Sequence, residues 1–286
     1  MSDLTNAHHH DAELGQWTRH FRAGRTEHVT RLSGYHQLTP APGRHVTPAN
    51  FTIPLVIQFS RLRVESPGRT PIDTTAFVAG LTDAVGAVEA DRFIGMQADL
   101  TPIAAYRLTR GAIGRLAGTT ASVDEVFGPR GRRLVERLGN TENWRTRLDV
   151  LEEFLIEEIE AGSQPSPEVI GAWEVTARRH GAIRVEELAF DLGWSVRHLR
   201  NRLGEELGVS PKVLARLARF DHATRLLERQ AYADLGRIAL AAGFYDQAHL
   251  TNEWKRMAGR TPLQHLHVRG RRDRADSSKT AVELPA

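Results

Sequence analysis

Two segments in the C-terminal third of the chain share one layout, 50 residues apart. Residues 188–195 read Leu-Ala-Phe-Asp-Leu-Gly-Trp-Ser, and residues 238–245 read Ile-Ala-Leu-Ala-Ala-Gly-Phe-Tyr. In each copy a short apolar stretch ends at a glycine, the residue that most readily adopts the left-handed conformation at a helix end. Ser195 and Asp246 can then cap a second amphipathic helix. A short helix, a glycine turn and a second helix form a helix-turn-helix, so the sequence predicts two such units.

The stretch between the two units predicts one long helix, from Ser210-Pro211 to about residue 229. At ~1.5 Å per residue, roughly 18 residues span about 27 Å. Successive major-groove faces of B-DNA lie about 34 Å apart. We therefore hypothesise that this helix holds the second helix of each unit in adjacent grooves of one duplex. A helical bundle with an accidental repeat is the alternative.

The region from about 28 to 100 alternates between apolar and polar residues, which is typical of strands with one face inward. Within 51–59, Phe51, Ile53, Leu55, Ile57 and Phe59 share one face. Proline cannot donate to a sheet, so Pro54 predicts an edge strand or a bulge. The other predicted strands are 29–38, 61–65, 75–81 and 92–100. Short strands at this spacing favour a small sandwich or barrel.

Beyond residue 100 the apolar spacing becomes helical, and helices are predicted over 101–110, 122–127, 130–139 and 142–161. The last of these is a candidate dimer interface, with packing on the strands as the alternative. The predicted fold class is α+β: a β-rich domain with helices over 15–162, followed by an all-α domain over 166–268. Residues 1–14, with three consecutive histidines, are interpreted as a mobile arm, and residues 269–286 as a disordered tail.

The composition excludes several classes of function. The chain has no cysteine, so disulfides, cysteine-ligated zinc and thiol nucleophiles are excluded. Neither a phosphate-binding loop nor a zinc-protease motif is present. A hydrolase would need to combine residues that no spacing groups, namely His36, His45, Asp73, Asp83 and Asp99. We therefore expect no enzyme and no cofactor or metal. We also expect no membrane span and a cytoplasmic location, since no long apolar run or secretory signal occurs.

Charge is distributed unevenly along the chain. Residues 1–165 hold 18 basic and 20 acidic side chains, whereas residues 166–286 hold 20 basic and 15 acidic ones. A basic C-terminal part suggests that this part alone binds a polyanion.

The segment 242–255, together with Gly259-Arg260-Thr261-Pro262, resembles the signature of the AraC/XylS family of bacterial regulators. The resemblance covers residues 169–268, and it implies a DNA-binding domain of two helix-turn-helix units. Family members usually have arginine where Asn252 stands, and phenylalanine where Leu203 and Trp254 stand.

In such units the second helix enters the major groove with its N-terminal residues toward the bases. The predicted base-reading residues are Arg197, Arg200, Asn201, Gln247, Ala248, Thr251 and Asn252. The predicted phosphate contacts, which position the protein without reading sequence, are Ser195, Lys212, Arg216, Lys255 and Arg256. His198 and His249 occupy equivalent positions, interpreted as core or phosphate-facing.

The N-terminal part resembles the sensor regions of family members in its layout. This resemblance implies a sequence-specific transcription regulator controlled by a small-molecule effector. The partners are then double-stranded DNA, the effector, a possible second copy and possibly RNA polymerase. A ligand-independent architectural DNA-binding protein, with an N-terminal part used for dimerisation, is the alternative, because alternating strands suit a filled core equally well.

Overall fold

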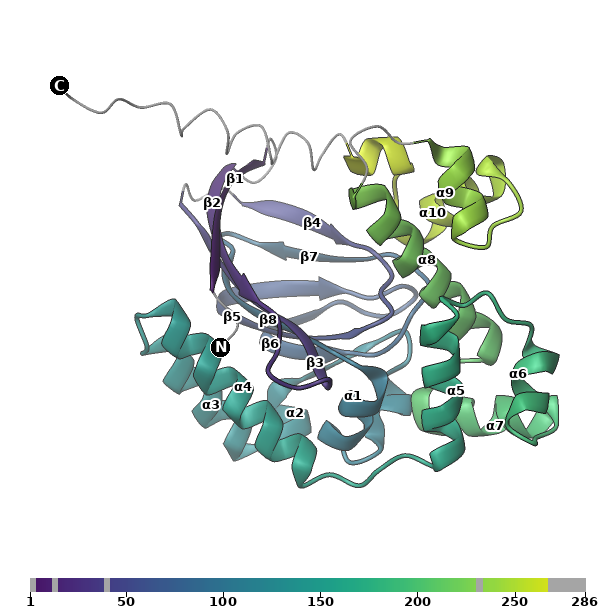
Figure 1. The fold of residues 1–286 in the computed structure, drawn as a ribbon. Helices are drawn as coiled ribbons and strands as arrows, with labels where there is room; N and C mark the ends of the chain where they lie inside the picture. The colour runs from purple at the N-terminus through teal and green to yellow at the C-terminus, as the bar shows by residue number, and fades with distance from the viewer. Residues whose placement is uncertain (1–3, 12–14, 39–41, 230–233, 267–286) are drawn as a thin grey trace.

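The computed structural model describes residues 4–11, 15–38, 42–229 and 234–266. Among these residues, nine antiparallel strands form one sheet in the order β1-β2-β3-β8-β5-β6-β9, with β7 pairing β5 and β4 pairing β7 (Figure 1). The strands are β1 Thr5–Asp11, β2 Gly15–Arg22, β3 Val29–Gln37, β4 Gly43–Thr47, β5 Ile53–Glu65, β6 Ile72–Ala79, β7 Gly86–Ala90, β8 Ile94–Leu100 and β9 Thr120–Ser122.

Strand β5 is the centre of this sheet and joins two predicted strands, 51–59 and 61–65, into one. It pairs with β8, β6 and β7 along its 13 residues. The expectation of an edge strand at Pro54 is therefore wrong. The proline is accommodated because it stands one residue from the start of β5, where β8 is paired but pairing to β6 begins only at Leu55. The irregularity in β5 lies between Ile57 and Leu62 instead.

Both faces of β5 are used. Ile53, Leu55 and Ile57 are fully buried in the main core, as their alternation predicts. Val56, on the opposite face, belongs to a separate apolar cluster with Leu62, Val64, Phe77, Ala90 and Phe93. The sheet thus has one face against helices and another that surrounds a cavity.

The predicted helices after the sheet are present as α1 Pro102–Leu108, α2 Val123–Phe127, α3 Pro129–Gly139 and α4 Trp144–Glu160, with the 3-10 helix η1 Ala112–Leu116. Thr101 caps α1 by accepting a hydrogen bond from the Ala104 N–H, and Ser122 caps α2 in a capping box with Glu125. These helices lie along one side of the sheet (Figure 1).

The burial of its apolar residues shows which face of α4 packs on the rest of the protein. Leu148, Leu151, Leu155 and Ile159 are at most 1% exposed and belong to the main core. This face packs on the sheet and on α1, so it is not a dimer interface.

The remaining helices follow the predicted repeat: α5 Pro167–Arg178, α6 Val185–Asp191, α7 Val196–Leu207, α8 Pro211–Arg229, α9 Leu235–Ala241 and α10 Gln247–Ala258. The two turns contain Gly193 and Gly243, at φ of 69° and 77°. Helix α8 runs between the pair α6–α7 and the pair α9–α10 (Figure 1).

Two expectations for the chain ends have different outcomes. The interpretation of residues 1–14 as a mobile arm is wrong for Thr5–Asp11, which form β1 and pair with β2 from Thr5↔Phe21 to Asp11↔Gly15. The predicted tail over 269–286 lies outside the described residues. Within the described part of the chain, no helix combines the length and apolarity that crossing a membrane requires.

Candidate nucleic-acid interface

The N-terminal end of α7 is built as the sequence predicts. The Ser195 hydroxyl accepts a hydrogen bond from the His198 N–H at 3.2 Å, which starts the helix. Leu199 and Leu203 are fully buried and fix the orientation of the helix. Because side chains three to four positions apart share a face, the opposite face remains for contacts. The exposed residues there are Arg197, Arg200 and Asn201.

The N-terminal end of α10 repeats this arrangement. Asp246 accepts a hydrogen bond from the His249 N–H at 2.7 Å, while Leu250 and Trp254 are fully buried. Gln247, Ala248 and Asn252 are exposed, and Thr251 is half-buried. The residues predicted to read bases therefore gather on the outward face of two equivalent helix starts.

His198 and His249 are exposed, so the core alternative is wrong, and the phosphate-facing alternative stays a prediction. Each packs its ring edge against the aromatic residue of its turn, His198 on Trp194 and His249 on Phe244. His249 also accepts a hydrogen bond from the Tyr245 N–H through its Nδ1 atom at 3.2 Å. The two rings therefore support the turns.

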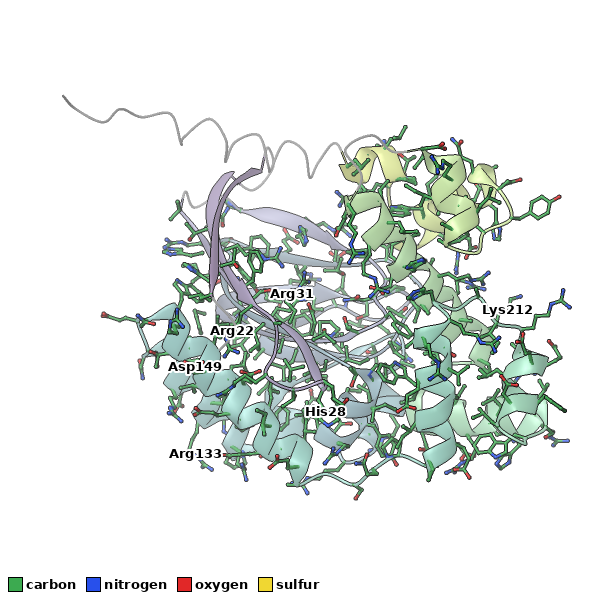
Figure 2. The ribbon with its side chains drawn as sticks, viewed as in Figure 1. Arg22, His28, Arg31, Arg133, Asp149 and Lys212 are labelled. Carbon is green, nitrogen blue, oxygen red and sulfur yellow. The ribbon has the colours of Figure 1, made fainter. Side chains whose placement is uncertain are left out.

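The predicted phosphate contacts fall into two groups. Ser195, Lys212 and Lys255 are exposed, and Figure 2 shows Lys212 among the C-terminal helices on the side away from the sheet. Arg216 and Arg256 instead form ion pairs with Asp83, which lies between β6 and β7.

Glu253 of α10 completes this cluster. Its carboxylate lies 3.2 Å from both Arg216 Nε and Arg256 Nη2. Burial by itself lowers the pKa of Arg256, but the hydrogen bonds to Asp83 and Glu253 outweigh it and raise the pKa above its ordinary value. Sequence reasoning missed this arrangement because Asp83 is 133 residues from Arg216.

Helices α7 and α10, the second helix of each unit, are attached to the β-rich part at their C-terminal ends. Helix α7 ends at Gly208, where a Cβ atom would stand 2.3 Å from the Gly114 carbonyl oxygen of η1. The Met257 carbonyl of α10 accepts a hydrogen bond from the Ala49 N–H at 2.7 Å. Gly259, just after α10, lies against Val46 and Val85. The N-terminal ends of α7 and α10 are thus exposed, and their C-terminal ends are fixed.

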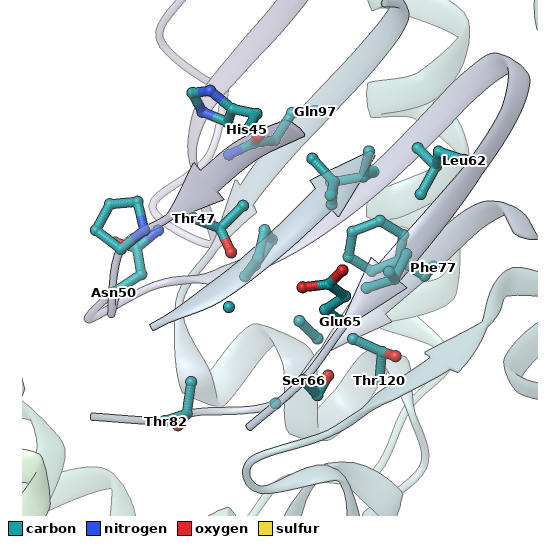
Figure 3. A pocket seen from close by; sticks show the side chains of 18 of the residues that line it. His45, Thr47, Asn50, Leu62, Glu65, Ser66, Phe77, Thr82, Gln97 and Thr120 are labelled. Carbon is teal, nitrogen blue, oxygen red and sulfur yellow. The ribbon is translucent and has the colours of Figure 1, made fainter. Parts of the chain in front are cut away.

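A cavity of about 340 Å³ opens inside the curved sheet (Figure 3). Its apolar wall includes Val56, Leu62, Phe77 and Phe93. Figure 3 shows His45 and Gln97 toward one end, and Glu65, Ser66 and Thr120 grouped toward the other.

Several charged and polar groups line this cavity. Arg31 bonds Asp99 at 2.8 Å, and Glu65 accepts hydrogen bonds from Arg44 at 2.6 and 3.2 Å. Burial raises the pKa of the Tyr35 phenol far above its ordinary value, opposed by the positive charge of Arg19. Tyr35 is therefore a neutral hydrogen-bonding group. The alternating strands were the one sequence signal for this cavity, and they did not identify its lining. No cluster of metal-ligating side chains occurs in the described ranges.

A model of the helix-turn-helix domain matches residues 188–267, which run from α6 through α10. The C-terminal region of the chain therefore contains a helix-turn-helix domain of the AraC type. This confirms the resemblance on which the residues of the second unit were interpreted. The two positions where AraC-type proteins usually have phenylalanine, Leu203 and Trp254, are fully buried. Asn252, which replaces the usual arginine, is exposed.

Solved structures are similar to this chain, and two ToxT structures share its overall fold. An apo variant of ToxT from Vibrio cholerae is 10% identical, with a TM-score of 0.52 over 86% of this chain and 99% of that one. ToxT bound to (E)-4-(8-methylnaphthalen-1-yl)but-3-enoic acid is 9% identical, with a TM-score of 0.50 over 93% and 98%. The C-terminal domain of AraT, a response regulator from Geobacillus stearothermophilus, is 25% identical over 37% of this chain and 88% of its own, with a TM-score of 0.35. No curated protein matches the chain.

Proposed function

We propose that this regulator reads a specific DNA sequence through α7 and α10 and responds to a small molecule bound in the sheet cavity. Residues 15–162 would then sense the ligand, and residues 166–268 would bind DNA. The observation that carries the proposal is that one loop, between β6 and β7, both lines the cavity and contacts α8 and α10. A ligand in the cavity therefore has a direct physical route to the DNA-binding helices.

DNA reading is assigned to the two exposed helix starts. Arginine can donate two hydrogen bonds to guanine, and asparagine or glutamine can pair with adenine. Arg197 and Arg200 suit the first role, and Gln247 and Asn252 suit the second. Ala248 permits close approach to a thymine methyl group.

We expect Arg197→Ala to weaken binding to the preferred site by about 1–3 kcal/mol and to relax preference at one base pair. The Arg197 side chain is exposed and forms no ion pair within the part of the chain that the structure describes, so the fold should be retained. Selection of bound duplexes from a random library, with wild type and variant in parallel, measures the preference at each position.

Lys212→Ala is the matched control, since Lys212 is exposed and lies on α8 rather than on a recognition helix. It should weaken binding to all sequences alike and reduce the salt dependence by about one phosphate contact. An unchanged base preference in the Arg197 variant would remove Arg197 from the reading surface.

The cavity suits an amphipathic ligand. Its volume of about 340 Å³ is within the range of small-molecule sites. Leu62, Phe77 and Phe93 can pack on an apolar body, while Arg19 and Arg31 can meet an anionic or acceptor group. The ToxT neighbour bound to an aryl-substituted butenoic acid gives the first class of compound to test: carboxylic acids with an apolar ring system.

A bound compound should raise the melting temperature, because a ligand at about 100 times its Kd stabilises the folded state by about 2.7 kcal/mol. We expect Val88→Trp to abolish this shift, since Val88 lines the cavity and the larger ring would fill it. Val88→Ile, which adds one methylene, should retain most of the shift. If no ligand class stabilises the wild type, the ligand-independent architectural function is favoured.

A further inference from the structure

The cluster around Asp83 joins three separate parts of the chain. One Asp83 oxygen, Oδ2, accepts hydrogen bonds from Arg216 of α8 and from Arg256 of α10, the latter at 3.0 Å. Glu253 forms ion pairs with the same two arginines. The side chains of Asp83, Arg216 and Glu253 are 20–23% exposed, whereas that of Arg256 is 40% exposed, so the cluster is partly shielded and opens to solvent at Arg256.

The guanidinium groups that bind Asp83 are the kind of donor that also binds phosphate. Guanidinium groups bind carboxylate and phosphate oxygens with the same donors, and arginine is favoured where either anion is recognised. With Asp83 in place, two cations face two carboxylates and the local charge is balanced. Without Asp83, Arg216 and Arg256 would exceed Glu253 by one positive charge and could accept another anion.

The loop that holds Asp83 is also part of the cavity. Thr82 and Ala84, on either side of Asp83, line the cavity, and the Thr82 hydroxyl accepts a hydrogen bond from the Ala84 N–H at 3.2 Å. Val85 then packs on Gly259 at the end of α10. A change in this loop would therefore act on both the cavity and the two arginines.

We propose that Arg216 and Arg256 form a binding site for a backbone phosphate of DNA, and that Asp83 occupies this site in the present state. The carboxylate and the phosphate exclude one another, so the site opens only when the loop over 82–86 moves. This inference rests on the proposed function, because it is the cavity ligand that would move the loop.

The test uses the full chain and a random-sequence duplex, with binding followed by fluorescence anisotropy at several salt concentrations. Asp83→Asn should bind about fivefold to tenfold more tightly near 0.1 M salt, and its log–log salt slope should steepen by about one to two. Asp73→Asn is the control for net charge, because Asp73 is exposed at the far end of β6. Screening should keep its effect below about twofold.

Arg216→Gln, made in both backgrounds, gives a second measurement that does not depend on the folding of the Asp83 variant alone. In the wild type Asp83 already occupies Arg216, so this change should weaken binding by a smaller factor than it does in Asp83→Asn. In the Asp83→Asn background, Arg216→Gln should cancel most of the gain in DNA affinity. Equal effects in both backgrounds, or tighter binding by Asp83→Asn with an unchanged salt slope, would overturn the proposal.

Melting curves with candidate carboxylic acids separate this inference from the proposed function. Tighter DNA binding by the Asp83 variant, with no compound raising the melting temperature, would support the phosphate site and contradict effector control. A raised melting temperature with a compound, but no tighter DNA binding by the Asp83 variant, would support effector control and contradict the phosphate site.

Discussion

Glu152→Ala is expected to lower the free energy of unfolding by about 3–5 kcal/mol, the cost of breaking a buried ion pair by removing one partner. The Glu152 side chain is fully buried, and its Oε2 accepts from Arg22 Nη1 and Arg25 Nε, each at 2.6 Å. Oε1 accepts from the Arg25 N–H. Figure 2 shows Arg22 between the sheet and α4. The alanine variant leaves the Arg22 guanidinium, 6% exposed, with only Asp149 as an ion-pair partner.

Asp149→Asn is the matched control. Asp149 contacts the same arginine at 2.8 Å but is 44% exposed, so its loss should cost about 1 kcal/mol or less. Urea unfolding of the three proteins measures the difference. The combined change Arg22→Met and Glu152→Leu should recover much of the lost stability, because a buried ion pair is often replaceable by apolar packing. A cost near 1 kcal/mol for Glu152→Ala would show that burial of this pair is not maintained in solution.

Trp254→Ala is expected to destabilise the chain by about 3–5 kcal/mol and to abolish DNA binding by the second unit. Trp254 is fully buried on α10 and packs edge-on against Phe220 of α8 and against His265, with ring centroids 5.1 and 5.5 Å away. It holds the recognition helix against the linker helix. Urea unfolding and anisotropy with a selected duplex would measure the two effects.

Trp254→Phe is a control that the chain itself suggests. Among the residues that the structure describes, the indole N–H of Trp254 has no hydrogen-bond partner, so phenylalanine removes volume without breaking a described hydrogen bond. Trp254→Phe should cost less than Trp254→Ala, because the cost of a large-to-small replacement in a core grows with the cavity that it leaves. Comparable losses for alanine and phenylalanine would mean that ring size, rather than apolar burial, positions α10.

The helices were predicted well because their signals are local. The predicted caps Ser195 and Asp246 stand where the structure begins α7 and α10. The repeat around Gly193 and Gly243 predicted both turns, because a left-handed φ is a requirement that one residue meets by itself. The base-reading residues stay predictions, although the exposure of most of them agrees with that role.

Strands were predicted less completely because pairing depends on distant segments. Strand β1 was missed since Thr5–Asp11 is polar, and only its partner β2 makes it a strand. Strand β7 pairs with both β4 and β5, a branching that periodicity does not encode. The same limit applies to Asp83, whose role depends on Arg216 and Arg256 arriving from helices far along the chain.

The separate attachment of the two recognition helices has a consequence for operator geometry. The C-terminal end of α7 contacts η1, and the C-terminal end of α10 is hydrogen-bonded to Ala49. The distance between the N-terminal ends of α7 and α10 is therefore set by the β-rich part as well as by α8. Lengthening α8 by one turn would strain the contact of α7 with η1 and the hydrogen bond of α10 to Ala49 before it changed the distance between the two DNA half-sites. Under the proposed function, the β-rich part therefore helps to set the spacing between the two DNA half-sites that α7 and α10 contact.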